Sequence, residues 1–314
     1  MNEVDEDAVE ARGAGEDATD ESDAEEAVAS QIMTDPGQPT AREREEHGFT
    51  NFPPRPRCKW CLYGKGQHDH HRFVVRMDGP EEIAIPAISL DYCFMGTRNT
   101  RAVDNPILVA FDNRTNALAA WQVFENGAVG WVAGDVARFI GSLGYDKMRV
   151  TLKSDGEIPI TALQNLVAQT TEAPTVVVET AARESKSNGA MDVRVKSWQA
   201  QFKTMLADLQ SCIGCKIPLG DKVISCLVIW AATTLNKYKM DAAGRTAFQR
   251  VTGGTQRRPI AMFGRRVLWM PKAESNVFEG VFIGIKGLST EAVTATEGGV
   301  VHARTARRRR LEER

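Results

Sequence analysis

Short apolar runs separated by turn-forming residues dominate the middle of the chain. Residues 87–94 (AISLDYCF), 106–111 (PILVAF) and 118–124 (LAAWQVF) each have the length of a β-strand. Residues 112–114 (DNR) separate the second run from the third, and residues of this kind favour a tight turn. Because the connections are short, the pattern predicts an antiparallel meander of three strands.

The pattern then alternates between helix and strand. Residues 131–143 carry apolar side chains at helical spacing, and residues 148–152 (MRVTL) have strand character. Residues 160–167 are again helical, and residues 175–178 (TVVV) form a short run rich in β-branched side chains. Together with the meander, this order predicts an α/β fold whose core is a five-stranded mixed sheet flanked by helices.

The clearest helical pattern follows this sheet, at residues 192–209. Every third or fourth residue is apolar there, and the stripe consists of Val195, Trp198, Phe202, Met205 and Leu209. Such a stripe predicts one face against a core and an opposite, polar face in solvent. Residues 223–235 form the longest apolar run of the chain. They are too few to cross a bilayer, so we expect a buried helix and no membrane contact.

The end of the chain returns to strands. Strand-like runs are expected at residues 266–270, 278–285, 292–296 and 300–303, with glycine-containing turns between them. They predict a small β module, such as a barrel. Four consecutive arginines follow, namely Arg307, Arg308, Arg309 and Arg310. A run of like charges is expected to be solvated and to bind phosphate.

Charge is distributed unevenly along the 314 residues. Residues 1–46 contain 16 acidic side chains and three arginines, a charge of −13, so the rest of the chain carries +11 within a net charge of −2. A basic body favours a polyanionic partner such as DNA. Residues 1–45 contain no aromatic side chain, and we expect a disordered acidic arm there.

The composition therefore predicts four parts. They are the arm at 1–45, a loop-rich region with cysteines and histidines at 46–80, the mixed-sheet core at 81–255, and the small β module with its basic tail at 256–314. The chain does not begin with a signal-peptide pattern, and six cysteines are too few for a disulfide framework in a chain of this length. We expect an intracellular protein.

Three aspartates are the strongest candidates for chemistry. Asp91 lies in the first predicted strand, Asp155 closely follows residues 148–152, and Asp192 begins the long helix. Carboxylates on neighbouring strands can hold two divalent cations about 4 Å apart, which is the arrangement that serves in-line displacement at phosphate. Such hard oxygen ligands select magnesium or manganese. A single aspartate beside a strand is also commonly a solvated turn residue, and this alternative stays open.

A cysteine and histidine segment is a second candidate. Cys58 and Cys61 form a C-x-x-C pair, and His47 precedes them, which favours zinc. Zinc needs a fourth ligand, and the candidates further along the chain are His68, His70 and His71. These histidines are equally expected as solvated loop residues. A further pair, Cys212 and Cys215, lacks a nearby histidine and is expected to be a pair of semi-buried thiols.

Several segments, in their order along the chain, resemble the integrase region of long-terminal-repeat retrotransposon polyproteins. They are His47, Pro53, Cys58 and Cys61, then LDYCFMG around Asp91, KSDG around Asp155, and ESKSNGAMD at residues 184–192. Weaker similarity follows in GRTAF at 244–248, MFG at 262–264 and GGVVHAR at 298–304. The resemblance covers about residues 45–310, and the order and spacing of the motifs are more specific than any single motif.

The resemblance implies a ribonuclease-H-like catalytic core with a DDE triad that binds two metal ions, trims DNA 3′ ends and joins them to a target strand. Asp91 and Asp155 match the first two acids. The third motif of the family, N-G-x-x-E, is N-G-A-M-D here and ends in Asp192. An aspartate is one methylene shorter than a glutamate, so its carboxylate would sit about 1 Å back from a metal. Glu184 is the nearest alternative acid.

Two further positions depart from the family pattern. Asn51 stands where the family has a second histidine, and Ala247 stands where it has a proline. The resemblance also implies that one face of the long helix contacts DNA, through Lys196, Gln199 and Lys203. We therefore expect a nuclear, DNA-binding integrase that can form homo-oligomers and is catalytically impaired. The alternatives are a non-catalytic DNA-binding relic of an integrase and a ribonuclease-H-type nuclease.

Overall fold

The computed structural model describes residues 37–65, 85–95, 106–179, 185–256, 261–271 and 276–308. A first sheet is formed by five strands: β1 (Ala87–Cys93), β2 (Ile107–Asp112), β3 (Leu118–Gln122), β4 (Val150–Ser154) and β5 (Thr175–Glu179). The strand order is β3-β2-β1-β4-β5, with β1, β2 and β3 antiparallel and with β4 and β5 parallel to β1. The predicted meander and the predicted mixed sheet are confirmed.

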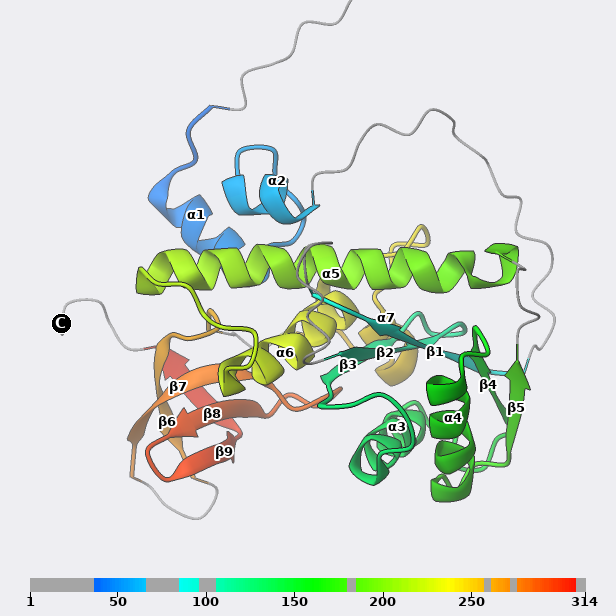
Figure 1. The fold of residues 1–314 in the computed structure, drawn as a ribbon. Coiled ribbons are helices and arrows are strands. Elements are labelled where there is room, and N and C mark those ends of the chain that lie inside the picture. Colours follow the sequence, from blue (N-terminus) through cyan, green and yellow to red (C-terminus); the bar gives the residue numbers. More distant parts are fainter. Residues whose placement is uncertain are drawn as a thin grey trace, which may run out of the picture. The chain divides into compact units, whose positions relative to one another are not determined.

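Helices cover both faces of this sheet (Figure 1). They are α3 (Gly130–Ser142) and α4 (Ile158–Thr170) on one face, and α5 (Ser185–Ile213) and α6 (Lys222–Tyr238) on the other. Alternate residues of β2 supply the two cores, because Leu108 packs with the α3 and α4 residues and Val109 packs with the α5 and α6 residues. All six residues of β2 are buried as a result.

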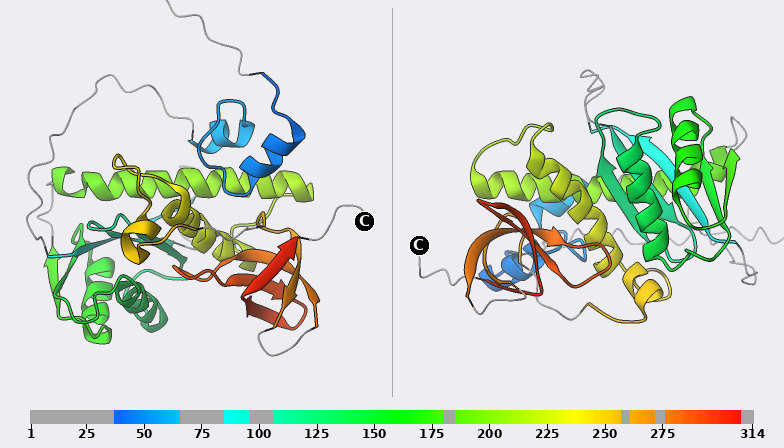
Figure 2. Two further views of the ribbon diagram at one scale, coloured as in Figure 1. Left: turned by 180° about the vertical axis from the view of Figure 1, so that it is seen from behind. Right: turned by 90° about the horizontal axis from the view of Figure 1, so that it is seen from below.

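Helix α5 is longer than the pattern predicts. The expected helix begins at Asp192, whereas α5 begins at Ser185 and ends at Ile213, and it runs past the first sheet and past α6 in opposite views of the molecule (Figures 1 and 2). The polar residues before Met191 carry no apolar stripe, so the hydrophobic pattern alone could not find this first turn. The apolar stripe is buried as predicted, and Trp198 and Phe202 stack at 5.5 Å between ring centroids.

A second sheet follows at the C-terminal end. Its strands are β6 (Arg266–Met270), β7 (Phe278–Ile285), β8 (Ala292–Thr296), β9 (Gly299–Ala303) and β10 (Thr305–Arg308). All neighbours are antiparallel in the order β10-β6-β7-β8-β9. Helix α6 packs against β7 as well as β3, and Trp230 of α6 meets Phe282 of β7 edge to face at 5.4 Å. The short helix α7 (Ala247–Thr252) lies between α6 and this sheet in the sequence.

The first two members of the arginine run belong to a strand and not to a tail, although Arg307 is exposed as expected. Arg307 and Arg308 lie in β10 and pair with Leu268 and Val267 of β6. The antiparallel ladder with β6 supplies backbone hydrogen bonds that a run of charges does not reveal in the sequence. Arg309 and Arg310 fall outside the described residues.

The predicted loop-rich region contains two helices, α1 (Ala41–Gly48) and α2 (Lys59–Lys65). Helix α1 also begins inside the range expected to be disordered, because Thr40 and Glu43 form a capping box at its first turn. The rest of the acidic arm, residues 1–36, lies outside the described residues.

Contacts with α5 order this N-terminal region. Helix α2 packs against α5 at Gly64, where an added Cβ would meet the Thr204 side chain and the Ala200 carbonyl. The Gln201 side chain donates a 2.7 Å hydrogen bond to the Thr50 carbonyl. Helices this short are not stable alone, so tertiary contacts, including those of α2 with α5, stabilise this region.

In the ranges given above, no helix combines the length and the apolarity that crossing a bilayer would require. Helix α6, which holds the longest apolar run, is buried among the sheets and α5 as expected.

Candidate functional site

Two of the predicted acids lie at the carboxyl ends of adjacent parallel strands. Strand β1 pairs with β4 in the register Ser89 to Lys153, so Asp91 and Asp155 occupy equivalent positions two residues further along. Strand alternation gives Asp91 the same side of the sheet as Cys93, which packs in the α5 core. Asp91 therefore belongs to the face that α5 covers, and the charge of Asp155 acts on it.

Local structure holds Asp155 in place. The chain turns from β4 into α4 at Gly156, whose φ of +80° is in the left-handed region that favours glycine. The Asp155 carboxylate accepts a 3.2 Å hydrogen bond from the backbone N–H of Glu157. The K-S-D-G sequence thus provides a strand end, a fixed carboxylate and a tight turn.

The third predicted acid comes from α5. Met191 and Val195 are buried in the core between α5 and the sheet, and Asp192 is exposed beside Met191. The helix packs against β1 and β2, and the negative charge of Asp192 acts on Asp91. Glu184, the alternative acid, lies outside the described residues.

Electrostatics link the aspartates. Burial, together with the negative charges of Asp155, Asp192 and Glu157, raises the pKa of Asp91 to about 6. Asp91 is therefore half-buried among three other carboxylates, and we call these four residues the acidic cluster. Such a cluster favours the binding of cations. When no cation is bound, repulsion among its negative charges destabilises the fold.

Glu157 was missed in the sequence. It lies outside every predicted strand and helix, and it precedes α4 as the N-cap residue. Its spacing two residues after Asp155, across the glycine turn, is the signal that could have revealed it.

Gln199 joins α5 to the strand that carries Asp91. Its side chain hydrogen-bonds the Cys93 thiol, whose pKa is raised to about 12 by burial and by the charge of Asp91. The predicted DNA-facing stripe is therefore mixed, because Lys196 and Lys203 are exposed whereas Gln199 is half-buried and bonded inward. Arg307 is exposed on β10.

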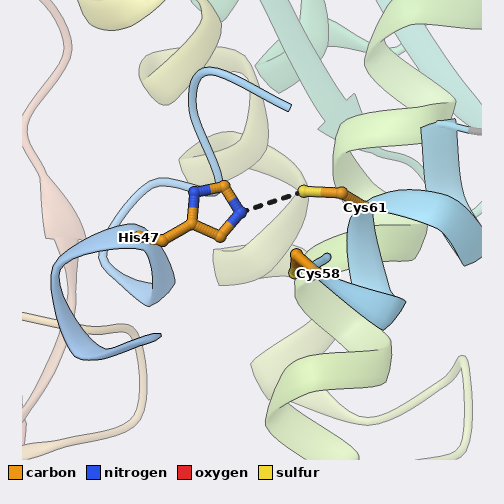
Figure 3. Close-up of side chains that lie close together, drawn as sticks. All are labelled: His47, Cys58 and Cys61. Atoms are coloured by element: carbon orange, nitrogen blue, oxygen red, sulfur yellow. Dashed lines mark hydrogen bonds between the residues drawn. The ribbon is translucent and has the colours of Figure 1, made fainter. Parts of the chain in front are cut away.

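A second group brings His47, Cys58 and Cys61 together (Figure 3). Their ligand atoms all lie within 4.8 Å of one another, and His47 Nε2 is 3.1 Å from Cys61 Sγ. Tetrahedral zinc would separate a nitrogen and a sulfur ligand by about 3.6 Å. In the described part of the chain, the three aspartates are not gathered as tightly as this Cys/His group.

The protonation states in the Cys/His group depend on burial. Burial lowers the pKa of His47 to about 4, helped by the charges of Arg55 and Lys65, so the imidazole is neutral and able to bind a metal. Burial raises the pKa of Cys61 to about 11, so a metal would have to displace the thiol proton. His47 Nδ1 is buried and has no hydrogen-bond partner in the described residues.

Asn51 is buried beside this group. It adopts φ +55°, and its carbonyl accepts hydrogen bonds from Lys65 at 2.7 Å and from the Cys61 thiol at 3.8 Å. The ammonium of Lys65 also lies 4.0 Å from the centre of the Phe52 ring. The backbone carbonyl of Asn51 thus holds the turn between His47 and Cys58 in place through these hydrogen bonds. The candidate fourth ligands His68, His70 and His71 lie outside the described residues.

The other C-x-x-C pair is separate from this group. Cys212 and Cys215 are both exposed near the end of α5, so the expectation of semi-buried thiols is wrong. The helix ends at Ile213 and leaves both side chains in solvent.

Comparison with solved structures finds similar chains, one of which belongs to an intasome. No protein-family model matches the chain, and no curated protein matches it. A cryo-electron microscopy structure of the simian T-cell lymphotropic virus intasome in complex with the PP2A regulatory subunit B56 gamma matches with a TM-score of 0.36 and 10% identity. The match covers 85% of this chain and 98% of that one. At this level it does not establish a shared function.

Proposed function

We propose that the chain is a retroelement integrase-like protein with a ribonuclease-H-like core, a metal-dependent polynucleotidyl transferase that processes DNA 3′ ends and joins them to a target strand. The observation that carries the proposal is the acidic cluster. Burial raises the pKa of Asp91, and the charges of Asp155 at the end of the adjacent parallel strand and of Asp192 on the packed helix add to this effect. This arrangement agrees with the family resemblance of the motifs around the same residues.

The donor set fits magnesium or manganese. Asp91, Asp155 and Asp192 supply hard oxygen donors, and the half-buried charge of Asp91 favours a cation over water. When bound, two such ions supply activation of the attacking oxygen and neutralisation of charge at the leaving oxygen. The chain itself contributes the rigid strand ends, the hydrogen bond that orients Asp155, and the helix that carries Asp192.

Asp192 is the weak point of this site. Its carboxylate is one methylene closer to the backbone than the glutamate of the family motif, and metal chemistry is sensitive to displacements of about 1 Å. We therefore propose an enzyme with poor strand transfer. A non-catalytic DNA-binding relic is the second candidate, and the same residue and Asn51 favour it.

We also propose that His47, Cys58 and Cys61 are three of four ligands of a structural zinc ion. Their tight grouping and the neutral state of His47 support this. DNA contacts are proposed for the exposed Lys196 and Lys203, for Gln199, and for the arginines of the C-terminal run, Arg307, Arg308, Arg309 and Arg310. These contacts rest on phosphate neutralisation. A nuclear location and homo-oligomers belong to the same proposal.

End joining of a labelled oligonucleotide in magnesium or manganese tests the proposal. We expect Asp192→Glu to raise the yield of joined product and Asp155→Ala to abolish it, with DNA affinity unchanged in both. Glu172→Gln, which removes an exposed carboxylate beyond α4, is the matched control. Cleavage without joining would identify the ribonuclease-H-type nuclease. If neither the wild type nor Asp192→Glu shows activity while the fold and DNA binding are intact, the relic is supported.

A further inference from the structure

A basic cavity lies on the other side of α5 from the predicted DNA-facing lysines. Its volume is about 220 Å³, and it is lined by residues of α5, of the β2–β3 turn, and of the segment from the end of α6 to α7. Three cationic side chains line it: Arg194, Lys239 and Arg245. None of them belongs to the acidic cluster, the Cys/His group or the proposed DNA-contact residues.

Arg194 is held rigidly at this cavity. Its guanidinium lies 4.7 Å from the centre of the Phe111 ring and donates a 2.8 Å hydrogen bond to Asn116 Oδ1. An arginine has five N–H donors in a planar fork, so this single bond leaves others for a ligand. Stacking on the ring reduces the rotamer freedom that binding would otherwise cost.

Lys239 and Ser197 form the second part of the donor set. The Lys239 ammonium donates to Ser197 Oγ at 2.7 Å. Because the hydroxyl accepts this bond, its own hydrogen is free to point at a ligand. Arg194 and Lys239 line the same cavity, and burial and the charge of Arg194 lower the pKa of Lys239.

One carboxylate also lines the cavity, but it is already paired with other groups of the chain. Asp241 forms an ion pair with Arg250 and accepts backbone hydrogen bonds from Ala243 and Arg245. Against the opposing effect of burial, these contacts lower the pKa of Asp241. Among the described residues, no carboxylate forms an ion pair with Arg194, Lys239 or Arg245. The cavity therefore has an excess of positive charge.

We propose that this cavity is a binding site for a phosphate group, held by Arg194, Ser197, Lys239 and Arg245. A planar fork, an ammonium and a hydroxyl that converge suit an anion with three or more acceptor oxygens better than a carboxylate, which has two. The volume is below that of drug-sized ligand sites, so the site accepts a phosphate with a small part of its substituent. The inference does not depend on the transferase activity proposed above.

Chemical labelling of lysines in the full chain tests the site. The purified protein is acetylated with limiting acetic anhydride while pyrophosphate is titrated, and the acetylation of Lys239 is compared with that of Lys216, an exposed lysine outside the cavity. We expect roughly tenfold protection of Lys239 once free pyrophosphate exceeds its dissociation constant about tenfold, with no protection of Lys216. Sodium chloride at matched ionic strength should protect neither residue.

Two variants make the test specific. Arg245→Gln changes an exposed side chain and Ser197→Ala removes only a hydroxyl, so both are expected to fold, which circular dichroism will check. Loss of one bond to a charged ligand should raise the half-protection concentration about tenfold or more. Lys216→Gln, which also removes one positive charge, should leave it unchanged.

The source of the phosphate is read from a parallel titration with a short DNA duplex. Half-protection at a lower phosphate concentration with duplex than with pyrophosphate identifies a nucleic-acid backbone, and the reverse order identifies a small phosphorylated molecule. Protection that is equal in chloride, or a half-protection concentration that neither Arg245→Gln nor Ser197→Ala changes, would overturn the assignment.

Discussion

The charge of Asp91 should destabilise the metal-free protein, and removing it should therefore stabilise the fold. In the folded state, burial and three neighbouring carboxylates raise the pKa of Asp91 to about 6, from an ordinary value of 3.8. The folded protein thus holds this proton more tightly than the unfolded chain does. Ionisation costs the folded state nothing below pH 3.8, an increasing amount up to pH 6, and a constant amount above it.

The size of this effect follows from the two pKa values. A difference of about two pH units corresponds to about 3 kcal/mol, since one unit is worth about 1.4 kcal/mol. Asp91 is partly exposed, and solvent screening reduces the figure to about 2 kcal/mol. Asp91→Asn carries no charge at any pH, so it should gain about 2 kcal/mol of unfolding free energy relative to the wild type between pH 4 and pH 7.5.

Urea unfolding in EDTA at both pH values measures this gain. The unfolding free energy of the wild type is subtracted from that of the variant at each pH, so the titration of all other groups cancels. Glu172→Gln serves as the control for the loss of an exposed carboxylate. Magnesium at pH 7.5 should then stabilise the wild type more than Asp91→Asn. An advantage of the variant that is the same at pH 4 and pH 7.5, or that shrinks as the pH rises, would refute the electrostatic reasoning.

Three further outcomes are expected. The purified chain should contain about one zinc ion. Cys58→Ser should lose this ion, and Cys215→Ser should keep it. Metal-free wild-type protein of unchanged stability would show that the Cys/His group is vestigial. Gly64→Ala should lower the unfolding free energy by about 1–3 kcal/mol, because its Cβ would press α2 away from α5. Gly134→Ala in α3 is the control: there is open space around it, and it should raise the unfolding free energy by up to about 1 kcal/mol. DNA affinity should fall steeply with salt, and Lys203→Gln should reduce the slope of the salt dependence by about one; a salt-independent affinity would contradict phosphate neutralisation.

Strands and the apolar face of α5 were predictable because their patterns are local. The meander shows in three apolar runs, and the stripe from Val195 to Leu209 has helical spacing. The positions of Asp91 and Asp155 relative to these strands follow from the same patterns. Their register depends on β4 pairing with β1, whose paired residues, such as Ser89 and Lys153, are 64 positions apart. The alternation of elements suggests such a pairing without fixing it.

Features that depend on distant contacts could not be predicted. Helices α1 and α2 are too short to be stable alone, and α2 packs against α5. Strand β10 exists because β6 offers an unpaired edge to Arg307 and Arg308, whose charge alone suggests a solvated tail. The cation cavity joins Arg194 to Lys239 and Arg245, which no motif connects.

The bond between Gln201 and the Thr50 carbonyl spans 151 positions of the chain and has a consequence for biosynthesis. A ribosome adds about 5–20 residues per second, so roughly 8–30 s separate the synthesis of these two residues. During that interval His47, Cys58 and Cys61 have been made, but the helix that orders their surroundings has not. Helices as short as α1 and α2 are not stable alone. The three residues of the Cys/His group are therefore synthesised early but reach their folded positions late. Until then, their two thiols are exposed to the reductants and metals of the cell.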